Sequence, residues 1–120
     1  MLRTLSHISL TASVVAALAV VPAAAAVAAG PPDTCQTNYR WLCGWSEGDF
    51  KGVEADFDWT PCQNSPVPLR SVANTVGKLS LAVMAVYSGP DCTGEFLGSV
   101  SAQQRLRYLP KPGLSVSVAV

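Results

Sequence analysis

Three carboxylates, Glu54, Asp56 and Asp58, are spaced two residues apart and are the residues whose types could most readily take part in catalysis. Paired carboxylates are the catalytic groups of glycosidases, where one acts as the acid and the other as the nucleophile or base. Apolar residues alternate with these acids, which is typical of a strand with one buried and one solvated face. All three acids then lie side by side, and we interpret them as part of a solvated outer face.

The only histidine, His7, lies in an N-terminal segment that we expect to be removed. Met1–Ala29 has a short positive head, an apolar run interrupted by a proline, and small residues that fit a signal-peptidase site. We expect cleavage after Ala28 or Ala29, although the run is also long enough for an uncleaved membrane anchor. Cleavage makes the protein secreted and extracellular. It also leaves no histidine for a Ser–His or Cys–His pair, so we predict that the protein is not an enzyme.

The mature chain, residues 30–120, has the size of one small domain. Removal of Arg3 leaves seven Lys and Arg residues against eight Asp and Glu, so no basic surface remains to attract nucleic acid. No further apolar run reaches the roughly 18 residues of a membrane helix. We expect a monomer that binds neither nucleic acid nor, after cleavage, a membrane, and that needs no metal or other cofactor.

Four cysteines remain in the mature chain: Cys35, Cys43, Cys62 and Cys92. An even number in a short exported chain indicates two disulfides, for which three pairings are possible. We expect Cys35–Cys43, which closes a small loop, and Cys62–Cys92, which would tie two parts of the chain together with roughly 3–4 kcal/mol of stabilisation. A zinc site is the alternative, which the lack of a Cys-x-x-Cys pair and of a mature histidine disfavours.

The chain repeats itself. The pattern Trp45-Ser46-x-x-Asp49-x-x-Gly52 returns 42 positions later as Tyr87-Ser88-x-x-Asp91-x-x-Gly94. A second echo follows in the same order, since Pro66–Val72 returns 44 positions later as Pro110–Val116. Two ordered echoes indicate an internal duplication, which decides the architecture.

Each repeat is expected to form about four short strands, because apolar and polar residues alternate between turn signals and no helical periodicity is sustained. Alternation is clearest at residues 39–46, 53–59, 105–108 and 114–120. The run Leu79–Tyr87 is apolar on both faces apart from Ser80, and we expect it to be a buried central strand.

In both repeats an aromatic residue is followed, after six residues, by a glycine and about twenty residues later by a serine. These residues are Trp45, Gly52 and Ser71 in the first repeat and Tyr87, Gly94 and Ser115 in the second. The pattern resembles the Greek-key motif of the βγ-crystallins. There the aromatic folds over a hairpin, the glycine adopts a backbone conformation that other residues resist, and the serine hydroxyl bonds back to the hairpin. The resemblance implies an all-β, βγ-crystallin-like sandwich of two Greek-key motifs, at about residues 36–76 and 77–120.

Within that superfamily the chain is most similar to the secreted, metalloproteinase-inhibitor-like proteins of peptidase inhibitor family I36. The similarity lies in Cys43–Ser46, Arg70–Asn74 and Leu106–Gly113. It implies a secreted inhibitor of an extracellular peptidase, in particular a metallopeptidase. Many βγ-crystallins bind calcium, but the matching windows here, Pro66–Ser71 and Pro110–Ser115, supply no carboxylate, so we predict no tight calcium site.

A second class of function is a non-catalytic extracellular module that binds a glycan or the cell envelope, or that is purely structural. Trp41, Trp45 and Trp59 all lie in the first half, and exposed indoles beside carboxylates can hold sugar rings. The simpler interpretation is that these aromatic residues fill a small core.

An inhibitor needs an exposed loop that is rigid before it binds, because ordering a flexible loop consumes affinity. The segment Thr60–Pro68 fits best, because three prolines fix their own φ angles and extend the residues before them. With Cys62 anchored through Cys92, we assign the inhibitory contact to Cys62, Gln63, Asn64, Ser65, Pro66 and Val67. The shorter Ser88–Thr93 is the second candidate, and an ordinary connection between strands is the alternative for the first.

Overall fold

The structure, a computed structural model, describes residues 30–32, 35 and 41–120 and is built from β-strands. The expected signal peptide, residues 1–29, lies outside the described residues. The strands are β1 (Leu42–Trp45), β2 (Glu54–Asp56), β3 (Gln63–Leu69), β4 (Ser71–Asn74), β5 (Val83–Tyr87), β6 (Phe96–Val100), β7 (Arg105–Leu106) and β8 (Gly113–Ala119). The prediction of an all-β chain with about four strands per repeat is therefore confirmed. In the part of the chain that the structure describes, no helix is long and apolar enough to cross a membrane.

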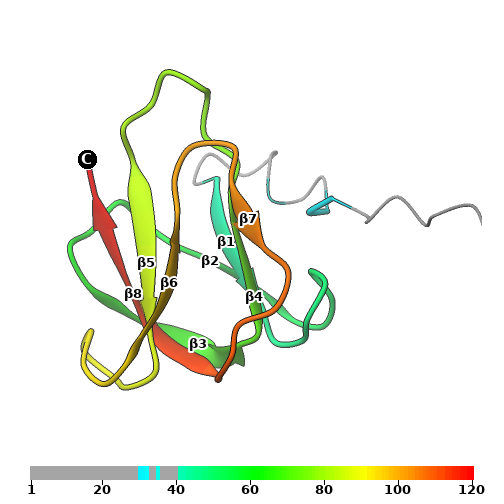
Figure 1. The fold of residues 1–120 in the computed structure, drawn as a ribbon, viewed down its shortest axis with the longest axis vertical. Helices are drawn as coiled ribbons and strands as arrows, with labels where there is room; N and C mark the ends of the chain where they lie inside the picture. Colours follow the sequence, from blue (N-terminus) through cyan, green and yellow to red (C-terminus); the bar gives the residue numbers. More distant parts are fainter. Residues whose placement is uncertain (1–29, 33–34, 36–40) are drawn as a thin grey trace, which may run out of the picture.

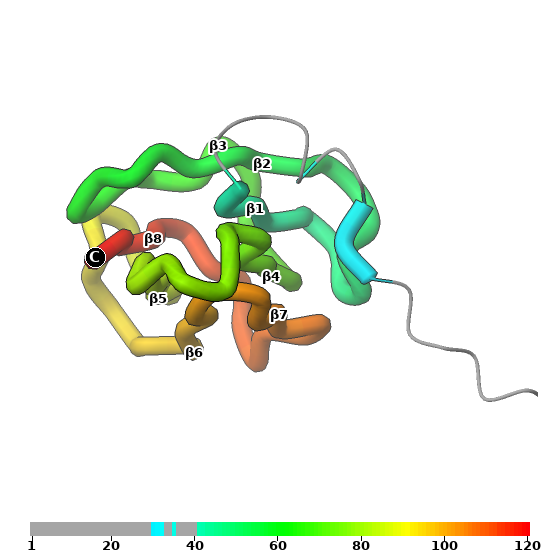
Figure 2. Tube along the Cα trace, turned by 90° about the horizontal axis from the view of Figure 1, so that it is seen from above, coloured from blue at the N-terminus to red at the C-terminus, as the bar shows by residue number. Residues whose placement is uncertain are grey.

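The strands form two antiparallel four-stranded sheets (Figure 1). The first sheet has the order β2-β1-β4-β7, and the second has the order β3-β8-β5-β6. Figures 1 and 2 show β1, β4 and β7 on one side of the molecule and β8, β5 and β6 on the other.

The two sheets exchange one strand. The first sheet takes β1, β2 and β4 from the first repeat but β7 from the second, and the second sheet takes β5, β6 and β8 from the second repeat but β3 from the first. Replacing each strand by its counterpart in the other repeat converts one sheet order into the other. The duplication seen in the sequence is therefore also a relation between the sheets, although neither sheet coincides with one repeat.

The core lies between the sheets and is filled by apolar side chains from both. Its largest fully buried members are Phe57, Leu42, Leu69, Met84 and Leu109. Gly113 brings β8 close to this core, since a Cβ there would collide with the Val86 side chain. A second, smaller cluster lies on the outer face of the first sheet and contains Trp45 and Phe50. Their rings pack edge to face with centroids 5.3 Å apart.

Both expected disulfides are present. Cys35–Cys43 joins residues eight positions apart within the smaller cluster, and Cys62–Cys92 joins residues 30 positions apart. The second disulfide connects the start of β3 to the hairpin between β5 and β6. This disulfide therefore links β3, which comes from the first repeat, to a hairpin of the second repeat in the same sheet.

The expectation of a buried strand over Leu79–Tyr87 is wrong at its N-terminal end and on one face. The Ser80 N–H donates to the Gly77 carbonyl (2.9 Å), so the segment begins with a turn and not with a strand. Strand β5 begins only at Val83, and Leu79 and Leu81 are 97% and 77% exposed. Within β5, burial alternates between the two faces, so only one of them belongs to the core.

The expectation that Cys62–Val67 is a loop is also wrong, because most of the segment belongs to the edge strand β3. Strand β3 pairs with β8 at Gln63, Asn64 and Leu69, and the register shifts between Asn64 and Leu69. Pro66 and Pro68 lie in that irregular stretch. Since proline has no N–H to donate, it is tolerated in a strand at an edge or a bulge, which this position provides.

Candidate functional site

The two hairpins that follow β1 and β5 have the same fold, residue for residue. Asp49 and Phe50 adopt positive φ angles (57° and 60°), as do Asp91 and Cys92 (54° and 56°). In each hairpin a serine hydroxyl accepts a backbone N–H seven residues later, Val53 to Ser46 and Glu95 to Ser88, both at 2.8 Å. Every partner is displaced by the 42 residues of the repeat.

A glycine closes each of these hairpins in the left-handed region. Gly52 has φ +84° and Gly94 has φ +78°, and a Cβ on either residue would collide with the serine hydroxyl of the same hairpin. L-residues avoid this backbone region and glycine does not. The recurring glycine is therefore required for two reasons: its φ angle is positive, and there is no room for a Cβ. The backbone role expected for these glycines is confirmed.

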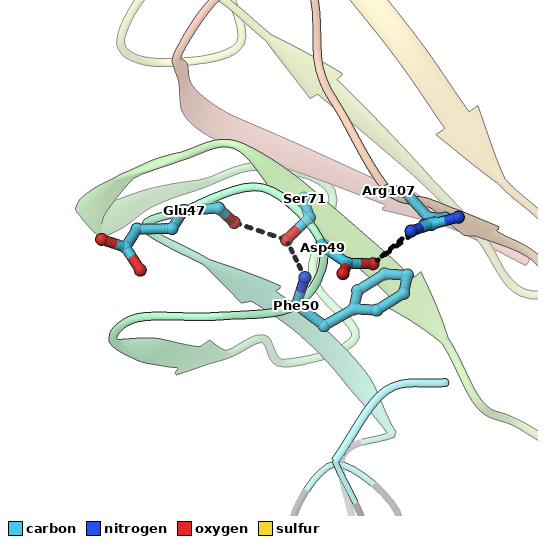
Figure 3. Close-up of polar contacts among 5 residues, drawn as sticks. All are labelled: Glu47, Asp49, Phe50, Ser71 and Arg107. Carbon is cyan, nitrogen blue, oxygen red and sulfur yellow. Dashed lines mark hydrogen bonds and ion pairs between the residues drawn. The ribbon is translucent and has the colours of Figure 1, made fainter. Parts of the chain in front are cut away.

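A buried serine from the fourth strand of each repeat fastens the hairpin to the sheet, as the sequence predicted. The Ser71 hydroxyl accepts the Phe50 N–H (3.0 Å) and donates to the Glu47 carbonyl (2.8 Å; Figure 3). Its counterpart Ser115 accepts the Cys92 N–H (2.9 Å) and donates to the Gly89 carbonyl (2.6 Å). Both serines are fully buried.

Each hairpin is also held from outside by the strand region exchanged from the other repeat. In the first repeat, the Asp49 N–H donates to the Arg107 carbonyl (2.7 Å), and the Asp49 carboxylate accepts from the Arg107 guanidinium (2.8 and 2.9 Å; Figure 3). In the second, the Asp91 N–H donates to Asn64 Oδ1 (2.7 Å), and Asn64 Nδ2 donates back to the Asp91 carboxylate (3.0 Å). The two aspartates are therefore structural turn residues, each held by a side chain more than 25 positions away.

The two segments considered for an inhibitory contact prove to be one surface. The Cys62–Cys92 disulfide and the paired hydrogen bonds of Asn64 with Asp91 join them side by side. We call the surface formed by residues 60–68 and 88–93 the cross-linked surface. No sequence signal beyond the expected disulfide indicated that the two candidates meet.

Several side chains expected to face a partner instead hold the cross-linked surface together. Gln63 accepts the Asp58 N–H (3.1 Å) and donates to the Asp58 carbonyl and to the Thr60 hydroxyl. The Ser65 hydroxyl donates to the Val67 carbonyl (2.6 Å). The residues of this surface that are exposed and have little conformational freedom are Pro61, Cys62, Pro66, Pro68, Pro90 and Thr93.

An exposed ion pair flanks this surface. Lys111 Nζ lies 2.8 Å from Glu95 Oε2, and the hydrogen bond to this carboxylate raises the pKa of Lys111 above its usual value. Arg107 behaves alike, since its hydrogen bond with Asp49 raises the pKa of its guanidinium. The Lys111–Glu95 pair is solvent-exposed, and exposed pairs contribute little to stability because water screens them, whereas Arg107 and Asp49 are partly buried.

The other chemically interesting groups do not converge on a reaction centre in the described residues. Glu54 and Asp56 lie close to Cys43, but the sulfur of Cys43 is bonded to Cys35 and is not available to a metal ion. A small pocket of about 70 Å³ lies between Pro31, Asn74 and Arg105, far below the roughly 300–1,000 Å³ of small-molecule sites. It contains none of the residues that the sequence singled out as an inhibitory contact.

Comparison with known proteins gives no relative. No family model, no curated protein and no solved structure matches this chain.

Proposed function

We propose that this chain is a secreted inhibitor of an extracellular peptidase, in particular a metallopeptidase, and that the cross-linked surface makes the contact. The observation that carries the proposal is the pre-ordering of this surface. A disulfide, the Asn64–Asp91 pair and the inward hydrogen bonds of Gln63 and Ser65 fix it before any partner arrives. A rigid contact surface loses little conformational entropy on binding, which is the main requirement for a tight protein inhibitor.

The proposal also rests on the resemblance to inhibitor family I36 and to the βγ-crystallins. Two features support that resemblance: the duplicated hairpin with its glycine and serine, and a strand order in which β4 lies beside β1 and β8 beside β5. We propose on this basis that the sheets are a pair of Greek keys and that residues 1–29 are a cleaved signal peptide. The two disulfides are compatible with an extracellular protein.

The exposed prolines allow a direct test of the contact. Pro66→Arg places a long, charged side chain in the middle of the cross-linked surface without removing any hydrogen bond described above. If this surface makes the contact, the variant should raise the inhibition constant by at least about tenfold, the effect of losing about 1.4 kcal/mol of binding energy. Inhibition is measured against a panel of secreted metallo-, serine and cysteine peptidases, with the protein produced by export from the full chain.

Pro110→Arg is the matched control. Pro110 is the counterpart of Pro66 in the second repeat, it is exposed, and it lies outside the cross-linked surface. It should leave the inhibition constant unchanged. If Pro66→Arg and Pro110→Arg have the same inhibition constant, the cross-linked surface does not make the contact. A parent protein that inhibits no peptidase in the panel would refute the proposal.

One observation favours the second candidate, a glycan-binding or envelope-binding module. Trp41 and Trp59 are both exposed, whereas Trp45 is fully buried. If this candidate is correct, the protein should co-sediment with insoluble polysaccharide or cell wall, and Trp59→Ala should abolish that co-sedimentation. Protein that stays in the supernatant would reject this candidate.

A further inference from the structure

The two disulfides differ in their access to solvent. Cys35 and Cys43 are both fully buried and belong to the smaller apolar cluster on the first sheet. Cys62 is exposed, and Cys92 is partly exposed. Because reduction requires a thiolate to reach one of the two sulfur atoms, exposure decides which bond is open to the reaction. The fold therefore offers one disulfide to an external thiol and shields the other.

The exposed disulfide fastens the part of β3 that the sheet holds least. β3 is an edge strand, and its register with β8 is interrupted between Asn64 and Leu69. Two prolines lie within this interruption and have no N–H to donate. Leu69 is fully buried and fixes the C-terminal end of the strand, whereas Asn64 and the residues before it are exposed or only partly buried.

Few contacts other than the disulfide join the N-terminal end of β3 to the second repeat. Gln63 and Asn64 pair with β8, the Thr60 carbonyl accepts the Val118 N–H (3.1 Å), and the Asn64 side chain bonds Asp91 at the exposed surface. The hydrogen bonds of the Gln63 side chain stay within its own segment. Exposed hydrogen bonds of this kind open locally at a low free-energy cost, so the disulfide is the strongest of these links.

The hairpin on the other side of the disulfide is held without it. The Cys92 N–H donates to the buried Ser115 hydroxyl (2.9 Å), and the Glu95 N–H donates to the Ser88 hydroxyl (2.8 Å). All of these partners belong to the second repeat. The Val116 carbonyl oxygen lies 3.3 Å from Cys92 Sγ and can accept the S–H that reduction creates. Reduction should therefore free the end of β3 and leave the hairpin folded.

We propose that the Cys62–Cys92 disulfide is a redox switch, which a dithiol opens to release the N-terminal end of β3 from the hairpin between β5 and β6. The buried Cys35–Cys43 disulfide stays intact. The cross-linked surface is then ordered in the oxidised protein and loses its order in the reduced one. The switch goes beyond the proposed inhibition and does not require it, but if that inhibition is correct, the reduced protein is the weaker inhibitor.

The reaction is a thiol–disulfide exchange in two steps. A thiolate of the dithiol attacks Cys62 Sγ, which belongs to the more exposed cysteine, and forms a mixed disulfide while Cys92 leaves as a thiolate. The second thiolate of the dithiol then attacks the dithiol's own sulfur in the mixed disulfide, and Cys62 leaves. The protein disulfide gains two electrons, the dithiol becomes a disulfide, and its two protons end on Cys62 and Cys92.

Timed reduction of the protein exported from the full chain tests the selectivity. The protein is treated with dithiothreitol without denaturant, samples are alkylated with iodoacetamide at intervals, and the labelled cysteines are identified by peptide mapping. Cys62 and Cys92 should be labelled at least about tenfold faster than Cys35 and Cys43, because only the first pair is accessible to the thiolate.

Amide hydrogen exchange of the partly reduced protein tests the consequence. The Asp91 N–H, which donates to Asn64, should exchange at least about tenfold faster than in the oxidised protein, whereas the Glu95 N–H should change by less than about threefold. The double variant Cys62→Ser with Cys92→Ser should show the faster exchange with or without dithiothreitol. The matched control, Cys35→Ser with Cys43→Ser, should respond to dithiothreitol as the parent does.

Three results would overturn the proposal. One is labelling of Cys35 and Cys43 as early as Cys62 and Cys92. Another is a partly reduced protein in which the Asp91 amide is accelerated no more than the Glu95 amide. The third is loss of the β-sheet circular dichroism as soon as the exposed disulfide opens, which would make this bond a purely structural one. None of these measurements uses a peptidase, so they test the switch separately from the proposed inhibition.

Discussion

Ser71 and Ser115 each satisfy two backbone groups of a folded hairpin with a single hydroxyl. These groups, a carbonyl and an N–H in an irregular turn, have no partner in a neighbouring strand, and the serine hydroxyl is their hydrogen-bond partner. A buried backbone group without a partner is costly, so the hydroxyl stabilises the folded-back form of the hairpin. A single small side chain thus satisfies two backbone groups of each hairpin.

Replacing Ser71 by Ala removes both hydrogen bonds and leaves their backbone partners without one. We expect a loss of about 1–3 kcal/mol in the free energy of unfolding, and a similar loss for Ser115→Ala. Ser101→Ala, at an exposed position between β6 and β7, is the control and should change stability by less than about 0.5 kcal/mol. Denaturant unfolding measures all three, and buried-serine variants as stable as Ser101→Ala would contradict the assignment.

At the scale of elements, the sequence predicted what local periodicity and spacing encode. The strand count follows from alternation between turn signals, and both disulfides follow from the even number of cysteines and the size of the loops they close. The hairpins with their glycines and serines follow from the 42-residue echo together with its resemblance to the βγ-crystallin motif. The edge strand β3 could not be predicted, because Pro66 and Pro68 argue against a strand unless its edge position is known. The exposure of Leu79 and Leu81 was missed for the opposite reason, since an apolar run shows which residues seek burial but not what covers them.

Strand β3 is attached to the hairpin of the second repeat by the Cys62–Cys92 disulfide and by the hydrogen bonds between Asn64 and Asp91. We expect the double variant Cys62→Ser with Cys92→Ser to lose about 3–4 kcal/mol of stability, because the closed loop is long, and the pair Cys35→Ser with Cys43→Ser to lose less, since its loop is short. Denaturant unfolding measures the losses.

Amide hydrogen exchange separates a local effect of this disulfide from a global one. The Asp91 N–H, which donates to Asn64, should exchange faster in the Cys62/Cys92 variant by a larger factor than the Phe50 N–H, which donates to Ser71. Equal acceleration of both amides would mean that the disulfide stabilises the whole molecule without a special role at the cross-linked surface.

At the scale of the whole molecule, the exchange of β3 and β7 makes the two repeats interdependent. Each sheet is completed by a strand from the other repeat, and each hairpin is held by a residue from it, Asp49 by Arg107 and Asp91 by Asn64. The main core is likewise shared, with Leu42 and Phe57 from one repeat packed in the same cluster as Met84 and Val116 from the other. A repeat on its own would therefore have an incomplete sheet and half a core.

This interdependence predicts a single cooperative unfolding transition. In calorimetry the van't Hoff enthalpy should equal the calorimetric enthalpy, and Ser71→Ala and Ser115→Ala, which lie in different repeats, should shift the same transition. Separate peptides covering residues 30–76 and 77–120 should each be unfolded, because neither can bury enough apolar surface, whereas mixing them at high concentration should restore β-sheet circular dichroism. Two resolved transitions, or one half that folds alone, would show that the strand exchange is dispensable and that the duplicated unit is itself a domain.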